Sequence, residues 1–92
     1  MAACIVGWSH SRFGRQDNAD LEALIVGVSQ QALADARVSG DEVDGIWLGN
    51  LNGGFVAESF CSSLVLQADE GLRWKPATRV ENACASGAAA IY

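Results

Sequence analysis

One segment near residue 84 carries side chains that could do nucleophilic chemistry. Cys84 stands where an expected strand passes into an expected helix, within Glu81-Asn-Ala-Cys84-Ala-Ser-Gly87. A thiol at a helix N-terminus faces unpaired backbone N–H groups and the positive end of the helix dipole, and both stabilise the thiolate. The small neighbours allow a sharp turn and access for an acyl group, and a backbone N–H of the turn could stabilise an oxyanion. The pattern predicts a nucleophilic cysteine for acyl transfer.

The same segment also admits a purely structural interpretation, and the residues alone leave both open. Free cysteine is among the most buried residue types, and small residues at the start of a helix are common packing devices. Cys4 and Cys61 each lie in an apolar stretch and are predicted to be core thiols. The three cysteines match neither a disulfide framework nor a zinc pattern, so we expect free thiols and a cytoplasmic location.

Other familiar chemical motifs do not occur in this sequence. The glycine-rich segment 50–54 is not followed by Gly-Lys-Ser/Thr, and the spacing G-x-G-x-x-G is not found, which excludes the usual phosphate-binding and dinucleotide-binding loops. A single histidine, His10, cannot build a histidine-rich metal site. We therefore expect no metal and no resident cofactor. The three tryptophans are predicted to be packing residues: Trp8, Trp47 and Trp74.

The composition is that of an ordinary globular domain with an acidic balance. The 92 residues are 50% hydrophobic and 18% charged, and the formal net charge is -5 at pH 7. Binding to nucleic acid or to anionic membranes needs a basic surface, so neither is an expected partner. No apolar run approaches the roughly 18 residues of a membrane-spanning helix, and no secretory signal is expected. Residues 1–92 are expected to form one domain at most.

The elements that must position Cys84 alternate along the chain. Helical periodicity is clearest over Leu21–Ala36, where apolar residues fall on one face. Asp17, Asn18 and Asp20 are its candidate N-caps, and its end is expected near residues 37–40. Strands are expected at 4–8, 45–51 and 77–82, and helices at 21–36, 55–69 and 84–92.

The order of these elements, β-α-β-α-β-α, predicts an α/β fold with a largely parallel sheet. Asn52-Gly53-Gly54 is expected to break the chain after the second strand. A parallel sheet buried on both faces needs more strands and more helical cover than three such units supply. We therefore expect residues 1–92 to be the front part of a larger domain.

With these elements in place, the sequence resembles the thiolase superfamily. The Cys84 segment and the alanine-rich helix after it are similar to the nucleophile segment of bacterial acetyl-CoA acetyltransferases and sterol-carrier-type thiolases. The opening Ile5-Val-Gly, the loop Phe13-Gly-Arg15 and the turn Asp41-Glu-Val-Asp-Gly45 are similar in order and spacing. The resemblance covers nearly all of the chain and identifies it with the N-terminal portion of such an enzyme.

The resemblance implies a fold, a reaction and an assembly. The fold would be the front part of the layered α/β/α N-terminal domain of a thiolase. Cys84 would take the acyl group from an acyl-CoA substrate and pass it to a second acceptor, in a Claisen condensation or in thiolysis within lipid metabolism. One strand would pair with its counterpart across the two-fold axis of a homodimer, or within a homotetramer; its residues are Thr78, Arg79, Val80 and Glu81.

The resemblance also implies parts that residues 1–92 do not contain. Thiolases are several-fold longer, and their second half supplies a histidine that activates the nucleophile and a second cysteine that moves the α-proton of the substrate. His10, Cys4 and Cys61 stand in other sequence contexts. We therefore expect the chain alone to be inactive.

Two alternatives stay open at this point. A β-ketoacyl synthase has the same fold and a similar Ala-Cys-Ala segment, although Glu81-Asn82 favours a thiolase. In a non-catalytic interaction module, the strand Ala77–Asn82 would pair with a partner and Cys84 would be inert.

Overall fold

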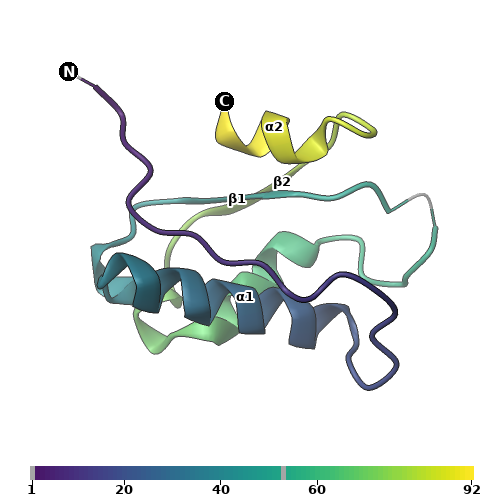
Figure 1. The fold of residues 1–92 in the computed structure, drawn as a ribbon. Helices are drawn as coiled ribbons and strands as arrows, with labels where there is room; N and C mark the ends of the chain where they lie inside the picture. The colour runs from purple at the N-terminus through teal and green to yellow at the C-terminus, as the bar shows by residue number, and fades with distance from the viewer. Residues whose placement is uncertain (1, 53) are drawn as a thin grey trace.

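The computed structural model, which describes residues 2–52 and 54–92, places a two-stranded parallel sheet between helical layers (Figure 1). The strand β1 (Ile46–Gly49) pairs with β2 (Ala77–Val80), and the register sets Gly49 opposite Val80. Parallel strands need a long crossover between them, and helical turns fill that crossover here. The expected α/β class and the parallel pairing are confirmed, and each strand is shorter than expected.

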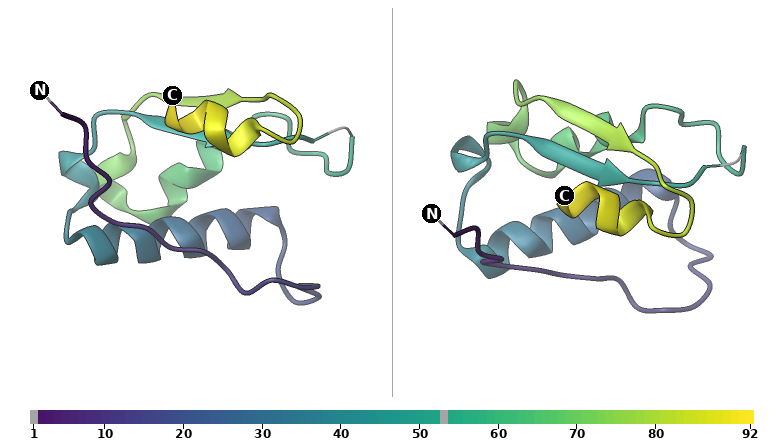
Figure 2. Two further views of the ribbon diagram at one scale, coloured as in Figure 1. Left: turned by 45° about the horizontal axis from the view of Figure 1, so that its top comes forward. Right: turned by 90° about the horizontal axis from the view of Figure 1, so that it is seen from above.

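Helices cover both faces of this sheet (Figure 2). The helix α1 (Leu21–Ala36) and the 3₁₀ segment η2 (Cys61–Ala68) pack together on one face, and α2 (Ser86–Ile91) lies against β1 on the other. Two shorter 3₁₀ turns, η1 and η3, lie at Gly40–Glu42 and Glu70–Leu72. None of the helices in the described part of the chain is long and apolar enough to cross a bilayer.

The helix α1 begins and ends where its sequence predicts. The Asp20 carboxylate accepts a hydrogen bond from the Ala23 N–H at 2.8 Å and so satisfies one free donor of the first turn. Arg37 adopts the left-handed conformation with a φ of 58°, and its N–H donates to the Ala34 carbonyl at 3.1 Å, which closes the helix. Both predicted bounds are confirmed, and Asp20 is the N-cap among the three candidates.

The core lies between α1 and η2. Its buried apolar residues in the described ranges are Ile25, Cys61, Val65, Ala68 and Leu72. Cys61 is fully buried, so the prediction of a core thiol at this position is confirmed. The Gln30 side chain of α1 donates to the Ala68 carbonyl at 3.2 Å and fixes the helix against η2.

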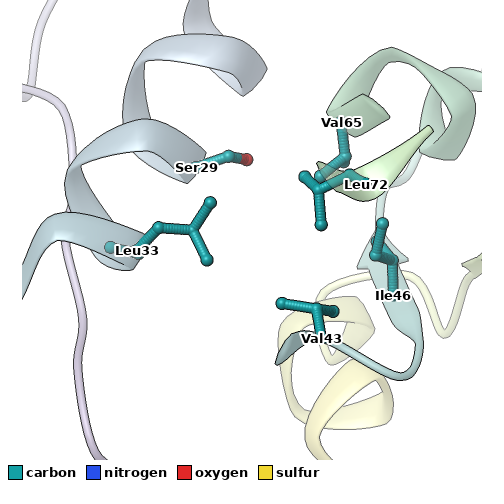
Figure 3. A pocket seen from close by; sticks show the side chains of 7 residues that line it. Ser29, Leu33, Val43, Ile46, Val65 and Leu72 are labelled. Atoms are coloured by element: carbon teal, nitrogen blue, oxygen red, sulfur yellow. The ribbon is translucent and has the colours of Figure 1, made fainter. Parts of the chain in front are cut away.

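An apolar cavity of about 230 Å³ lies beside this core, between α1 and β1. Figure 3 shows side chains of α1 on one side of it and those of β1, η2 and η3 on the other. The lining residues are Ser29, Ala32, Leu33, Val43, Ile46, Val65 and Leu72. All are apolar except Ser29, so the lining has no acid and no base that could act with a nucleophile. We interpret the cavity as incomplete packing.

Filling this cavity is expected to stabilise the fold. Ala32→Leu adds apolar volume from a helical position where leucine is well tolerated, and we expect a gain of about 0.5–2 kcal/mol in the free energy of unfolding. Urea unfolding followed by circular dichroism measures the gain. Ala34→Leu places the same side chain on the exposed face of α1 and should change stability by less than about 0.5 kcal/mol. Equal gains from both variants would contradict cavity filling.

The prediction of a first strand at residues 4–8 is wrong. Within the described residues this segment pairs with no strand, and it runs extended beside α1 (Figures 1 and 2). The Trp8 N–H donates to the Asp35 carboxylate of α1 at 3.0 Å, so a helix side chain takes the place of a neighbouring strand. Cys4, predicted to be a core thiol, is exposed along with this segment.

The tryptophans are also more exposed than predicted. The exposed fractions of Trp8, Trp47 and Trp74 are 66%, 61% and 90%. A core centred on α1 and η2 cannot cover side chains of this size on the outer surfaces, so their expected role as packing residues is not met within residues 1–92.

The helix predicted for residues 55–69 is shorter than expected and is a 3₁₀ segment. The Asn52 side chain accepts from the Val56 N–H at 3.1 Å and donates to the Val56 and Glu58 carbonyls at 3.1 and 3.4 Å. Side-chain bonds of this kind compete with helical hydrogen bonds, and they hold the chain in a turn up to η2. Gly53, part of the predicted chain break, lies outside the described residues.

Candidate active site at the Cys84 loop

The loop of residues 82–86 joins β2 to α2 at the carboxyl ends of both strands (Figure 2). In open α/β sheets, ligands bind outside this edge. Cys84 is exposed there, whereas Cys61 is sealed in the core. The structure therefore places the predicted nucleophile where a substrate can reach it.

Two hydrogen bonds of the Ser86 hydroxyl and two bonds between backbone groups hold this loop. Ser86 Oγ accepts from the Asn82 N–H at 2.9 Å and donates to the Ala83 carbonyl at 2.7 Å. The Ala85 N–H donates to the Asn82 carbonyl at 2.8 Å, and the Ser86 N–H donates to the Ala83 carbonyl at 3.2 Å. Cys84 thus lies in the middle of a turn whose two ends are bonded to each other.

Ala83, directly before the cysteine, has a φ of 46°. An alanine in this left-handed region costs roughly 1–2 kcal/mol, because its Cβ approaches the following carbonyl oxygen. Such conformations persist only where the surrounding structure imposes them, and they concentrate at functional sites. The hydrogen bonds of the loop supply that constraint here.

Gly49 allows the start of α2 to lie directly on the end of β1. A Cβ added at Gly49 would overlap the Ser86 carbonyl and would come within 3.1 Å of the Gly87 nitrogen. Only glycine leaves room for this approach, so Gly49 sets the position of the loop from the neighbouring strand.

The ends of the two strands are also tied to each other. Arg79 Nη1 donates to the Asn50 carbonyl at 2.8 Å and pairs with Glu81 Oε1 at 3.2 Å. Both charged side chains are partly exposed, so the ion pair contributes little and the bond to Asn50 matters more for geometry. The Asn50 N–H donates to the Val80 carbonyl at 3.1 Å, which extends the pairing one residue past β1.

Comparison with known proteins identifies the family to which this chain belongs. The sequence model described as "Thiolase, N-terminal domain" matches residues 3–92. The chain belongs to the thiolase family. This match confirms the resemblance predicted from the Cys84 segment and favours a thiolase over a β-ketoacyl synthase.

Two similar proteins are both named acetyl-CoA acetyltransferase. The acetyl-CoA acetyltransferase of Methanocaldococcus jannaschii is 35% identical over 88 residues, and that of Methanothermobacter thermautotrophicus is 37% identical over 89 residues. Each alignment covers 95% of this chain, which spans only 22% and 23% of the length of the two relatives. The matched region is therefore the N-terminal portion of a thiolase.

The thiolase domain presents Cys84 differently from the way its sequence predicts. The helix α2 begins at Ser86 and has six residues, so Cys84 lies before the first helical turn and not within it. The left-handed Ala83 and the bonds to Ser86 use residues 82–85 for a turn. Because the influence of a helix dipole falls off within about one turn, the turn itself is the stronger determinant of how the thiol is placed.

The histidine of this thiolase domain makes its contacts elsewhere. His10 packs between Trp8 and Phe13, with ring centroids 5.2 and 5.4 Å apart, and its Nδ1 lies 2.7 Å from the Ser11 carbonyl oxygen. Within the described residues no hydrogen bond reaches the Cys84 thiol, and no group of three or more His, Cys, Asp or Glu side chains could hold a metal ion.

Two residues that shape the Cys84 loop escape the sequence argument. Gly49 lies in β1 and makes room for the backbone of Ser86, and this contact depends on a pairing of β1 with β2 that cannot be deduced from composition. In the sequence, Ser86 is one of several small residues in the motif. The signal that could have found it is its residue type, because a serine two residues after the cysteine can bond back to the turn, as the buried Ser86 hydroxyl does in the structure.

Proposed function

We propose that this chain is the N-terminal part of a thiolase-type acyltransferase in which Cys84 accepts the acyl group. The observation that carries the proposal is the exposed Cys84 thiol on a constrained turn at the carboxyl edge of the sheet, in a chain of the thiolase family. The names of the two relatives support acetyl-CoA as the acyl donor.

The reaction at Cys84 is a thioester exchange. The thiolate attacks the carbonyl carbon of an acyl-CoA, a new C–S bond forms, and the bond to the CoA sulfur breaks as CoA leaves with the electron pair and takes up a proton. A second acyl-CoA then accepts the acyl group from Cys84 through its α-carbon, which gives up a proton and forms a C–C bond as the Cys84 thiolate leaves. The Ala85 and Ser86 N–H groups already donate within the loop, so the Cys84 N–H is our candidate donor to the oxyanion.

The base that activates Cys84 comes, in this proposal, from the portion of a thiolase that residues 1–92 do not span. A positioned base typically contributes about 10²–10⁴-fold to rate, so the 92-residue chain alone should be almost inactive. The outer edge of β2 and the residue after it, from Thr78 to Glu81, is the surface we propose for pairing with a second copy in a homodimer or homotetramer.

Acyl transfer to Cys84 can be tested directly by labelling. The polypeptide is purified as its native source produces it, mixed with labelled acetyl-CoA, quenched in acid and digested, so that mass spectrometry locates the acetyl group. We expect the label on Cys84 and at least about a 10²-fold loss of condensing activity in Cys84→Ser, because serine is a far weaker nucleophile at neutral pH.

The exposed Cys4 provides the matched control. Cys4→Ser removes another exposed thiol, outside the loop, and should retain both the label and the activity. Label on Cys4, or on neither cysteine, would overturn the proposed function and would favour the interaction module.

A further inference from the structure

The Ser86 side chain is buried, although it is polar and lies beside an exposed loop. Its residue is 6% exposed, and in the described ranges the other buried polar residue is Ser62, at 4%. The Ser86 hydroxyl accepts one hydrogen bond and donates another, both to backbone groups of the turn. A hydroxyl has one donor and two acceptor sites, so Ser86 uses its donor and one acceptor to join two successive residues.

These two bonds enclose the strained residue of the loop. The Asn82 N–H and the Ala83 carbonyl flank the left-handed φ of Ala83, and Ser86 Oγ is 2.9 and 2.7 Å from them. Because Cys84 follows Ala83 directly, the dihedral angles of Ala83 set the direction in which the Cys84 side chain leaves the backbone.

We propose that Ser86 is a positioning residue, whose hydroxyl holds Ala83 in its left-handed conformation and thereby sets where the Cys84 thiol meets the acyl carbonyl. This inference rests on the proposed function of Cys84 and deepens it. Ser86 acts through the backbone and need not touch the substrate.

Loss of this bridge should affect the chemical step more than binding. A displacement of about 1 Å in a reacting group can cost about 10²-fold in rate. We therefore expect Ser86→Ala to lower kcat by about 10- to 100-fold and to leave KM unchanged. Ser86→Thr retains the hydroxyl and should recover most of the activity.

The experiment uses the polypeptide as its native source produces it and compares Ser86→Ala, Ser86→Thr and Ser62→Ala. Ser62→Ala removes a serine hydroxyl that is equally buried but lies in η2, so it should leave kcat unchanged. A second readout, which does not depend on activity, is the rate of alkylation of Cys84 by iodoacetamide relative to exposed Cys4 in the same molecules. We expect this ratio to fall several-fold in Ser86→Ala only.

Each outcome supports the positioning role or overturns it. Equal kcat in the wild type and Ser86→Ala, with an unchanged alkylation ratio, would overturn it. Alkylation of the buried Cys61 in Ser86→Ala would show general loss of the fold, and Ser86 would then be a structural residue only. If the wild type takes no acetyl group on Cys84, the proposed function fails. The alkylation ratio would still decide whether Ser86 sets the position of the Cys84 thiol.

Discussion

Gly49→Ala is expected to displace the Cys84 loop and to destabilise the chain. The added Cβ would overlap the Ser86 carbonyl, and this neighbour is backbone that cannot rotate away as a side chain could. Overpacking of this kind typically costs about 1–3 kcal/mol. Relief would come from moving the start of α2 off β1, which carries the turn and its thiol along.

The effect is measured as the loss of unfolding free energy in urea and as the ratio of Cys84 to Cys4 alkylation. Gly87→Ala is the matched control, because a Cβ at Gly87 in α2 meets nothing within 4 Å. Alanine is favoured over glycine in a helix by about 1 kcal/mol, so this control should gain stability slightly. If Gly49→Ala behaves like Gly87→Ala in both measurements, the close approach of α2 to β1 is not what holds the loop.

Leu72→Ala is expected to cause the largest loss of stability of a single side-chain truncation. Leu72 is 2% exposed, and it lines both the core and the apolar cavity. Truncating a buried leucine typically costs about 2–5 kcal/mol, and the existing cavity would be enlarged on one side. Native domains have only about 5–15 kcal/mol of net stability, so this loss should raise the population of unfolded molecules strongly.

Alkylation of Cys61 reports this unfolding, because its thiol is fully buried in the native core. In Leu72→Ala, Cys61 should react with iodoacetamide far faster than in the wild type. Leu51→Ala makes the same substitution at a leucine that is 46% exposed and should change stability by no more than about 0.5 kcal/mol. Similar Cys61 rates in the two variants would refute the central place of Leu72 in the core.

Local sequence signals predict α1, because its cap and its apolar face depend on residues close together in the chain, and they predict where β1 and β2 lie, although the pairing of these strands joins residues far apart. Asp20 and the apolar face of Leu21–Ala36 define the helix without help from other elements. The apolar run at residues 4–8 carries a strand-like signal of similar strength, but a strand also needs a neighbour. That neighbour is distant in sequence, and in this structure the backbone at Trp8 bonds to Asp35 of a helix instead.

In the candidate site, too, features set by neighbouring residues can be predicted, and features set by residues distant in sequence cannot. The setting of Cys84 predicts a cysteine between a strand and a helix, but the residues alone leave open whether its thiol is exposed, and the structure shows that it is. The two-residue delay before α2 depends on the left-handed Ala83, which alanine propensity does not favour. The contact between Gly49 and Ser86 joins residues far apart in the chain, so only the folded arrangement brings it to light.

The edges of the two-stranded sheet, where further strands could pair, are separate from the end of the sheet at which the Cys84 thiol is exposed. Within the described residues, the outer edges of β1 and β2 carry no further strand, and both lie lateral to the carboxyl ends where the Cys84 loop stands. Strands can therefore be added on either side, from the same polypeptide or from another, without covering the thiol. Assembly along the strand edges and the chemistry proposed for Cys84 would therefore use different parts of this sheet.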